Sequence, residues 1–224
     1  MPKIRILGFT GPSGCGKDTA ARHLADTYPN LYHFVKLYTT RPQRNEKDDG
    51  YNFVKSGEFL EDVLNGNMLN AQEFNNWYYG MNIKGLVPDK INVVPMNAKM
   101  IEQMREENRN DIELKVIYIA TSAKKRLIHT LEREDKPDCT EICRRYLADM
   151  DDYILNHELI SFCSGWIENK YDVNFIYNIE HKALDCYPPN VLKEIGCFKL
   201  EPSDIDERLS KALTRFMADS DKIV

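Results

Sequence analysis

Short runs of β-branched and aromatic residues alternate along the chain with stretches whose apolar residues recur every three or four positions. Each run is short enough for a buried strand, and each intervening stretch has the spacing of one apolar helix face. The runs lie at residues 4–9, 32–38, 91–96, 114–120 and 172–177. The helical stretches lie at residues 19–25, 98–107, 123–134 and 140–155. This alternation predicts an α/β fold, with a parallel sheet flanked by helices on both faces.

Residues 39–85 interrupt the alternation. They are rich in Arg, Asn, Asp, Gly and Tyr, and they contain an amphipathic segment at residues 58–64. We interpret this stretch as an insertion that folds over the edge of the sheet. Near the end of the chain, residues 202–218 have the pattern of a terminal amphipathic helix.

Length and composition favour a single compact domain. The chain has 224 residues, of which 42% are hydrophobic and 29% are charged, which is enough for one sizeable core. No run of about 18 apolar residues occurs, and the first residues do not have the pattern of a signal peptide. The sequence therefore predicts a protein that neither spans a membrane nor is secreted.

The net charge limits the classes of ligand, and the cysteine content indicates the compartment. Because the net charge is −5, no overall positive field exists to hold a nucleic-acid polymer, and an anionic ligand must meet local clusters of Lys and Arg. This favours small phosphates. The six cysteines form no CxxC pair, which is typical of a reducing, cytoplasmic compartment. Cys139 and Cys143 are four residues apart, but two thiols alone cannot close a tetrahedral zinc site.

The most specific motif is a glycine-rich loop that follows the first predicted strand and opens the first predicted helix. Its sequence is Gly11-Pro12-Ser13-Gly14-Cys15-Gly16-Lys17-Asp18-Thr19. In a phosphate-binding loop, or P-loop, backbone N–H groups and the positive helix N-terminus hold the β-phosphate, while the lysine reaches the β- and γ-oxygens. An ordinary glycine-rich turn is the alternative, but it seldom has this strand-to-helix context. We expect ATP to bind at Gly11, Ser13, Gly14, Cys15, Gly16, Lys17, Asp18 and Thr19.

The loop departs from the usual motif at one position. The residue after the lysine is normally Ser or Thr and ligates Mg²⁺, whereas here it is Asp18. A carboxylate can hold Mg²⁺ directly or through water, although it also adds negative charge beside the triphosphate. Thr19 could supply the missing hydroxyl, from a different angle on the helix. We predict that Mg²⁺ binds with ATP, and we assign Asp18 as its ligand.

Three further motifs resemble a known family. Residues 39–44 read Thr-Thr-Arg-Pro-Gln-Arg, residues 50–54 read Gly-Tyr-Asn-Phe-Val, and residues 78–80 read Tyr-Tyr-Gly. With the P-loop, and in this order, they resemble the guanylate kinases over residues 5–178. The resemblance implies a P-loop kinase that moves the γ-phosphoryl group of ATP onto a nucleoside monophosphate (NMP), with GMP or dGMP as the family's acceptor. It also implies a core of residues 1–38, 86–132 and 141–224, an NMP-binding insert at 39–85 and a small lid at 133–140.

Two arginines and two tyrosines in these motifs suit a dianionic monophosphate. Arg41 and Arg44 can offer forked, charge-assisted hydrogen bonds to phosphate oxygens, and Tyr51 and Tyr79 can donate from the sides. The alternative is a solvated arginine pair on a loop. Because the surrounding stretch lacks the apolar pattern of a packed element, we assign these four residues to the phosphate of the acceptor.

Further arginines lie where the resemblance places the lid and the helix that follows it. It implies that Arg133 and Arg145 act with the P-loop lysine in catalysis, closing over the nucleotide and stabilising the charge that develops in phosphoryl transfer. Ion pairs on a helix surface are the alternative. Asp152 is expected to orient Arg145, and Arg126 and Arg144 are expected to face solvent.

The base pocket departs most from the family. Alignment from residues 78–80 places Asn70 and Met81 where guanylate kinases carry a guanine-reading Glu and a Ser or Thr. A second alignment places Asn97 at an Asp that also reads guanine. An amide reproduces half of a carboxylate's hydrogen bonds to guanine, and it also suits adenine, cytosine, or guanine read from its O6 and N1 side. Glu73 could substitute if the loop is shifted.

The last matching segment precedes an asparagine. Residues 172–177 look like the family strand that carries an Asn near the ATP ribose, which assigns Asn178 to ATP binding. Residues 156–170 resemble no part of the family. Two alternatives stay open: a kinase for another (deoxy)nucleoside monophosphate or small phosphorylated acceptor, and a non-catalytic guanylate-kinase-like interaction domain. Such domains lose the P-loop lysine or its flanking glycines, whereas this chain keeps them.

Overall fold

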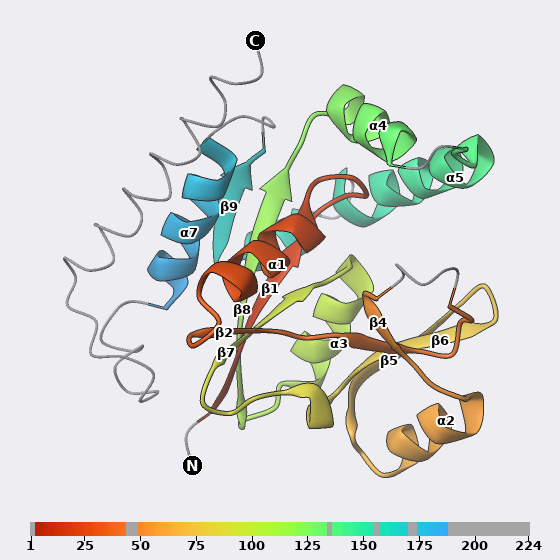
Figure 1. The fold of residues 1–224 in the computed structure, drawn as a ribbon, viewed down its shortest axis with the longest axis vertical. Helices are drawn as coiled ribbons and strands as arrows, with labels where there is room; N and C mark the ends of the chain where they lie inside the picture. The colour runs from red at the N-terminus through yellow and green to blue at the C-terminus, as the bar shows by residue number, and fades with distance from the viewer. Residues whose placement is uncertain (1–2, 44–48, 134–135, 155–156, 170–173, 188–224) are drawn as a thin grey trace.

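A computed structural model of the chain describes residues 3–43, 49–133, 136–154, 157–169 and 174–187. Its centre is a five-stranded sheet in the order β2-β7-β1-β8-β9, in which every neighbouring pair is parallel (Figure 1). The strands are β1 (Ile4–Thr10), β2 (Tyr32–Phe34), β7 (Ile91–Pro95), β8 (Ile112–Ala120) and β9 (Gly165–Glu168). The predicted parallel sheet is confirmed.

Two hydrophobic clusters cover the two faces of this sheet. The helices that pack there are α1 (Lys17–Thr27) and α7 (Asn174–Cys186) on one face, and α3 (Ala98–Glu107) and α6 (His157–Phe162) on the other. Phe9 and Ile117 belong to the first cluster, Ile6 and Val116 to the second, and all four are fully buried. Burial of one such side chain stabilises the fold by about 1.5–3 kcal/mol, so both faces contribute to the core.

A second, four-stranded sheet lies beside the first, in the order β4-β3-β6-β5 (Figure 1). Strands β5 and β6 form an antiparallel hairpin that turns at Asn75 and Asn76, both in the left-handed conformation that Asn tolerates. Leu69 and Met81 from this sheet join the second core cluster, which ties the two sheets together. The elements are β3 (Leu37–Thr39), β4 (Tyr51–Phe53), α2 (Ser56–Leu64), β5 (Met68–Phe74), β6 (Trp77–Asn82) and the 3₁₀ helix η1 (Ile83–Gly85).

A buried carboxylate holds α2 against the hairpin. Asp62 accepts hydrogen bonds from Nδ2 of Asn67 (2.8 Å), Nδ2 of Asn82 (2.5 Å) and Nζ of Lys84 (2.6 Å). These hydrogen bonds, led by that of Lys84, lower the pKa of Asp62 below its ordinary value. The second sheet therefore has a polar anchor of its own.

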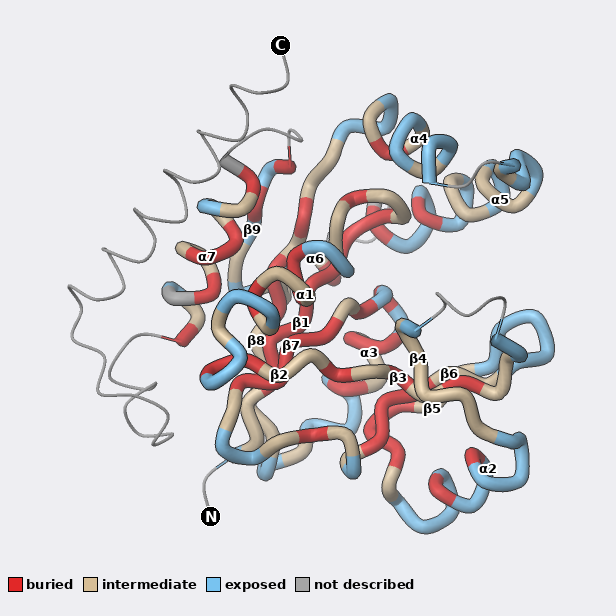
Figure 2. Tube along the Cα trace, in the orientation of Figure 1, coloured by how far each residue is buried: buried red, intermediate tan, exposed pale blue. Residues whose placement is uncertain are grey.

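Helices α4 (Ala123–Glu132) and α5 (Cys139–Asp149) stand at the carboxyl edge of the main sheet and expose much of their surface (Figure 2). Asp138 caps α5 by accepting a hydrogen bond from the backbone N–H of Glu141 (3.1 Å). Directly after α5 the chain continues as a π-helical turn, η2 (Met150–Ile154). Such turns interrupt helices frequently at functional sites.

The prediction of a strand at residues 172–177 is wrong, because α7 begins at Asn174. The buried apolar residues Phe175, Ile179 and Ala183 of α7 recur every four positions, which is helical spacing. The fifth strand of the sheet is instead β9, which lies in the stretch that resembled no part of the family. The β-rich run at the start of α7 has the local pattern of a strand, and the helical period becomes visible only over the longer stretch.

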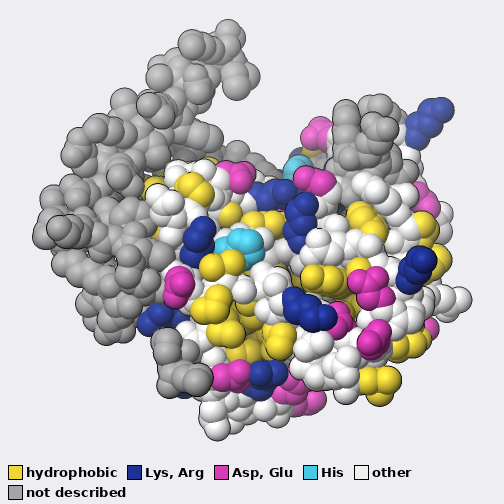
Figure 3. Space-filling view, turned by 60° about the horizontal axis from the view of Figure 1, so that its bottom comes forward, with side chains coloured by type: hydrophobic (Ala, Val, Ile, Leu, Met, Phe, Trp, Pro, Cys, Tyr) yellow, Lys and Arg dark blue, Asp and Glu magenta, His cyan; other side chains and the backbone are white. Residues whose placement is uncertain are grey.

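The predicted strand at residues 32–38 is divided between the two sheets as β2 and β3. Residues 202–218, predicted as a terminal helix, lie outside the described residues. No helix among those that the structure describes is both long and apolar enough to cross a membrane. On the face shown in Figure 3, basic side chains lie in small groups beside acidic and hydrophobic ones.

Candidate functional site

The glycine-rich loop lies between β1 and α1, at the carboxyl edge of the main sheet. Gly11, Gly14 and Gly16 have φ angles of 139°, 76° and 104°, which glycine adopts at little cost and other residues rarely adopt. Gly16 is the N-cap of α1, and no side chain of the described residues caps the helix there. The N–H groups of the first turn, together with the helix dipole, therefore suit an anion.

The packing around the loop also requires glycine. A Cβ atom on Gly11 would lie 2.5 Å from the carbonyl oxygen of Ile119, and one on Gly14 would lie 2.8 Å from the carbonyl oxygen of Arg126. Both neighbours are backbone atoms, which cannot rotate aside. Strand β8 and helix α4 thus fix the shape of the loop from two sides.

The far end of the loop is held by a buried asparagine. Nδ2 of Asn169 donates to the carbonyl oxygen of Cys15 (2.8 Å), and Oγ1 of Thr121 donates to the same oxygen (3.3 Å). Asn169 directly follows β9, and its backbone N–H donates to the carbonyl oxygen of Ala120 (2.7 Å). It is 2% exposed. Asn169 therefore orients the P-loop from the neighbouring strand end.

The sequence places Asn178 at the end of a strand, whereas residues 174–178 belong to helix α7. Asn178 lies inside helix α7 and is half-buried, whereas the asparagine that contacts the P-loop is Asn169. Sequence reasoning missed Asn169 because its strand was not identified. The run Trp166-Ile167-Glu168, directly before it, is the signal that could have revealed both.

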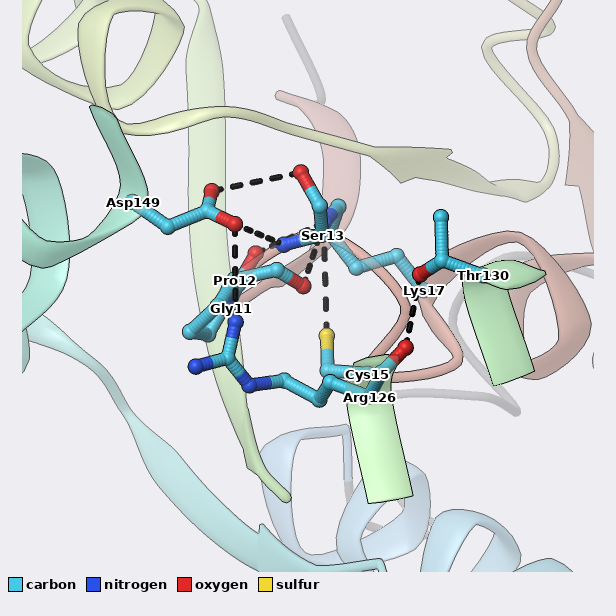
Figure 4. Close-up of polar contacts among 8 residues, drawn as sticks. All are labelled: Gly11, Pro12, Ser13, Cys15, Lys17, Arg126, Thr130 and Asp149. Carbon is cyan, nitrogen blue, oxygen red and sulfur yellow. Dashed lines mark hydrogen bonds and ion pairs between the residues drawn. The ribbon is translucent and has the colours of Figure 1, made fainter. Parts of the chain in front are cut away.

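Lys17 is folded back onto the loop. Its Nζ donates to the carbonyl oxygens of Gly11 (2.6 Å) and Pro12 (3.1 Å) and lies 4.0 Å from Sγ of Cys15 (Figure 4). Burial acts to lower the pKa of Lys17, but the acidic groups around it raise that pKa above its ordinary value. Burial raises the pKa of the Cys15 thiol. At neutral pH the loop therefore carries an ammonium charge and a protonated thiol.

A buried ion pair contacts the loop from the side of α4 and α5. Asp149, the last residue of α5, accepts hydrogen bonds from the backbone N–H (2.8 Å) and the hydroxyl (3.3 Å) of Ser13. Nη1 of Arg126, in α4, lies 3.5 Å from the same carboxylate (Figure 4). Arg126 is 4% exposed, so the prediction that it faces solvent is wrong. Because α4 packs directly on Gly14, the side chain of Arg126 is enclosed beside the loop.

The π-helical turn η2 adds a contact at the end of β1. The hydroxyl of Tyr153 and Oγ1 of Thr10 are 3.1 Å apart, and both side chains are buried. Burial raises the pKa of Tyr153 to about 12, so its hydroxyl stays protonated. This hydrogen bond fixes the turn that follows Asp149 to the strand that precedes the P-loop.

Asp18 and Thr19 lie in the first turn of α1, and both are exposed. Among the described residues, His, Cys, Asp and Glu form no group of three that could hold a metal ion. Mg²⁺ is commonly bound by one or two carboxylates together with substrate phosphates rather than by a protein cage. The exposed carboxylate of Asp18 beside the P-loop lysine fits that donor set.

Three of the four residues assigned to the phosphate of the acceptor lie together at the second sheet: Tyr51 in β4, Tyr79 in β6 and Arg41 shortly after β3. The guanidinium of Arg41 stands over the rings of Tyr51 and Phe53, at 5.4 Å and 5.2 Å from their centroids. The rings of Tyr51 and Tyr79 meet edge to face at 5.9 Å. Arg44, the fourth residue, lies outside the described residues. The sequence motifs thus converge on one aromatic and cationic cluster.

The three residues assigned to the base already make hydrogen bonds or packing contacts within the protein. Oδ1 of Asn70 accepts the backbone N–H of Met81 (3.1 Å), and Asn70 is 2% exposed. Met81 is fully enclosed in the second core cluster, so its side chain lines no open pocket, contrary to expectation. Asn97 caps α3 through the N–H of Met100 (2.8 Å) and faces the amide of Gln72. Sequence reasoning had not singled out Gln72.

The lid arginines are exposed or held by a neighbour on their own helix. Arg133 ends α4 and is exposed. Nε of Arg145 donates to Glu141 (2.7 Å), so Glu141, and not Asp152, is the residue that orients it. Arg144 also donates to Glu141 (2.6 and 2.8 Å). These hydrogen bonds lower the pKa of Glu141 to about 2, and the hydrogen bonding from Arg144 has the largest effect.

The chain is similar in sequence to the guanylate kinases. The sequence model of that family matches residues 3–163. A guanylate kinase from Helicobacter hepaticus is 35% identical over 112 residues, which are 47% of this chain and 56% of that protein. One from Nostoc sp. is 41% identical over 78 residues, which are 34% of this chain and 39% of that protein. The chain therefore spans about half or less of the length of these curated relatives.

The fold is also similar to that of a solved guanylate kinase. The crystal structure of the enzyme from Anaplasma phagocytophilum superposes with a TM-score of 0.55, over 92% of this chain and 94% of that one. The sequence identity is 18%, so this similarity concerns the fold. It confirms the predicted P-loop α/β architecture.

Proposed function

The chain belongs to the guanylate kinase family, and on that premise we propose that it transfers the γ-phosphoryl group of ATP to a nucleoside monophosphate. The observation that carries the proposal is the P-loop, whose three glycines of positive φ and Lys17 stand at the carboxyl edge of a parallel sheet. Ligands of open α/β sheets bind at that edge. The backbone N–H groups of the loop would hold the phosphates of ATP.

Lys17 would contact the phosphate oxygens of the triphosphate, and Asp18 would contact the Mg²⁺ bound with it. Lys17 Nζ, which now donates to loop carbonyls, would turn to the β- and γ-oxygens when ATP supplies better acceptors. When bound with ATP, Mg²⁺ would neutralise part of the negative charge of the phosphates. Asp18 would hold that ion directly or through water, with the hydroxyl of Thr19 as the neighbouring alternative. Both side chains are exposed and accessible for this role.

The cluster of Arg41, Tyr51 and Tyr79 would bind the phosphate of the acceptor. The guanidinium of Arg41 rests on aromatic rings, and its Nη1 donates to the carbonyl oxygen of Pro42 (2.9 Å), an exposed contact that it would exchange for phosphate oxygens. Arg44, three residues after Arg41, would complete the clamp. Since a monophosphate is already an anionic nucleophile, the reaction needs no separate general base.

Arg133 and Arg145 would act on the transferring group. Negative charge spreads over the equatorial oxygens during phosphoryl transfer, and arginines that close over them stabilise it. Arg145 is partly exposed and shares Glu141 with a second arginine, so it can exchange this partner for a phosphate oxygen. The exposed Arg133 directly follows α4 and is the first residue of the predicted lid.

The acceptor is GMP or dGMP by family membership, and we propose that its selection is relaxed. The side-chain oxygen of Asn70 already accepts a backbone N–H, and Met81 is enclosed in the core. The amides of the half-buried Gln72 and the exposed Asn97 face each other and offer a donor and an acceptor in place of carboxylates. Such amides also suit bases other than guanine.

The setting of the proposed reaction is the cytoplasm. The five cysteines of the described residues are free, which suits a reducing compartment. The partners that the site can accommodate are small: ATP with Mg²⁺ and one nucleoside monophosphate, rather than a nucleic-acid polymer.

A coupled assay against a panel of ribo- and deoxynucleoside monophosphates, with ATP and Mg²⁺, tests the proposal. We expect transfer to at least one monophosphate, with a preference for GMP weakened by about tenfold to a hundredfold for each missing carboxylate contact. Strict GMP specificity would contradict the proposed base selection and leave the kinase reaction standing. ATP binding without transfer to any monophosphate would contradict the proposed function and favour a different phosphorylated acceptor or a non-catalytic domain.

A further inference from the structure

Asp149 satisfies the P-loop as a phosphate would. Its two carboxylate oxygens accept the backbone N–H and the hydroxyl of Ser13, one residue of the loop that the fold offers to an anion. Asp149 is 8% exposed and belongs to a different helix, 136 residues away in sequence. A negatively charged group of the protein therefore already occupies part of the phosphate cradle (Figure 4).

Arg126 is the cation beside that carboxylate, and its hydrogen-bonding capacity is underused. The Nη1 atom lies 3.5 Å from Asp149, longer than the 2.7–2.9 Å of a good charge-assisted hydrogen bond. Its Nε is buried and finds no hydrogen-bond partner among the described residues. A buried guanidinium with an unmade hydrogen bond is unfavourable, so this arginine gains from a second, larger anion.

The surroundings of Arg126 hold its plane at the loop. The guanidinium stands over the ring of Tyr146, 5.1 Å from its centroid. The hydroxyl of Thr130 donates to the Arg126 carbonyl oxygen (2.6 Å), the same oxygen that would contact a Cβ on Gly14. The backbone of Arg126 is therefore held by Thr130, and its guanidinium is held by the ring of Tyr146. Only the anion that the guanidinium contacts is open to exchange.

We infer that Asp149 is a built-in substitute for a nucleotide phosphate, and that nucleotide binding passes the donors of Ser13 and Arg126 from Asp149 to phosphate oxygens. Arg126 is thereby a further phosphate-binding residue of the site. The inference rests on the proposed function only in so far as the loop binds a nucleotide.

The exchange is favoured by charge and permitted by local packing. A triphosphate that enters beside an ionised carboxylate meets like-charge repulsion, which is relieved when the carboxylate leaves. The end of α5 has a solvent-facing side, since Leu147 is 64% exposed and Met150, the first residue of η2, is 36% exposed. Tyr153 stays fixed to Thr10, so the movement needed at Asp149 is confined to the end of α5.

Equilibrium binding of a fluorescent N-methylanthraniloyl derivative of ATP, with no acceptor present, tests the inference. Asp149→Asn removes the competing charge while keeping an oxygen for Ser13, and we expect it to tighten binding at least threefold. In the Asp149→Asn background, Arg126→Leu should then weaken binding at least tenfold. The double variant removes both partners of a buried ion pair, so no lone charge is left in the interior, and its melting temperature reports whether it folds.

A matched control exists at the other end of β8. Arg109 donates to Asp111 through two hydrogen bonds of 3.0 and 2.7 Å at an exposed site. Arg109→Leu with Asp111→Asn changes the same residue types and should leave nucleotide affinity unchanged. If adding Arg109→Leu to Asp111→Asn weakened binding as much as adding Arg126→Leu to Asp149→Asn, the inference would be overturned, because the effect would then follow from the loss of one positive charge at any site.

The other outcomes separate the inference from the proposed function. Weaker binding in Asp149→Asn, or no effect of Arg126→Leu in that background, would overturn the inference whatever the turnover. Tighter binding in Asp149→Asn, the loss with Arg126→Leu, and no transfer to any monophosphate would support the inference and contradict the proposed function. Absence of nucleotide binding in every variant would contradict both.

Discussion

Arg144 in helix α5 lies over the ring of Phe74 at the end of strand β5, with its guanidinium carbon 4.8 Å from the ring centroid. Two hydrogen bonds to Glu141 fix the direction of this arginine. The contact links the helix that ends at Asp149 with the sheet that carries Arg41. One exposed pair of side chains thus connects the part that contacts the P-loop to the part proposed to bind the acceptor.

Phe74→Ala should loosen that link. A cation–π contact at an exposed site is worth about 0.5–1 kcal/mol, so we expect KM for the monophosphate to rise about two- to fivefold. The melting temperature should change little, since the ring is 42% exposed. Trp77→Ala, on the same hairpin and 37% exposed, is the matched control in the steady-state kinetics. Equal increases in KM for both variants would refute a specific role for the contact.

Lys17→Ala should lower phosphoryl transfer by about 10²–10³-fold, the usual effect of removing one preorganised donor to developing charge. Its stability should fall by no more than about 1 kcal/mol, because the ammonium bonds atoms of its own loop, the carbonyl oxygens of Gly11 and Pro12 and Sγ of Cys15. Lys90→Ala removes a similar bond, to the carbonyl oxygen of Pro29 (2.8 Å), and is the control. Turnover and thermal melts check both. Unaltered turnover in Lys17→Ala would exclude the proposed kinase reaction.

Asp18→Ala should raise the Mg²⁺ concentration needed for half-maximal rate at fixed ATP, because a carboxylate ligand is lost. Asp18→Ser should keep or raise the activity if the carboxylate only replaces the usual hydroxyl. Asp26→Ala, on the exposed end of the same helix, controls for the loss of one negative charge. A magnesium titration that is identical for wild type and Asp18→Ala would remove the ligand assignment.

Arg41→Ala and Arg145→Ala should separate binding from catalysis. Arg41 is assigned to a phosphate present in the ground state, so its loss should raise KM for the monophosphate about tenfold to a hundredfold. Arg145 is assigned to charge that develops during transfer, so its loss should lower kcat instead. Initial rates with each substrate varied in turn distinguish the two. The same change in KM from both variants would contradict these roles.

Asp62→Asn should destabilise the protein at pH 7 by about 1 kcal/mol, since three donors lose a charged acceptor. The pKa of Asp62 is lowered in the folded state, so its contribution is present above the unfolded pKa of about 3.9 and is lost as pH falls through the folded pKa. The difference from wild type should therefore shrink below about pH 4. Urea unfolding across pH checks it, with Glu61→Gln as an exposed control. A difference independent of pH would argue against the ion pair.

The P-loop could be predicted from the sequence because its determinants are local. A β-rich strand, glycines at Gly11, Gly14 and Gly16, and a helical pattern lie within about twenty-five residues. The positive φ angles found there are what glycine alone adopts freely. The motifs around Arg41, Tyr51 and Tyr79 were equally visible, since three short segments of fixed residue types suffice to place them in one cluster.

Other parts of the site were decided by packing between distant segments. Asn169 contacts Cys15, which lies 154 residues earlier in the sequence. The strand before Asn169, β9, is not predicted from the sequence because the β-rich start of the nearby helix α7 has the local pattern of a strand and is assigned in its place. The burial of Arg126 depends on α4 meeting the backbone of Gly14, and its pairing with Asp149 depends on where α5 ends. The sequence around an arginine on an amphipathic helix does not indicate which carboxylate another helix will place beside it. Only the tertiary structure could place that charge pair at the P-loop.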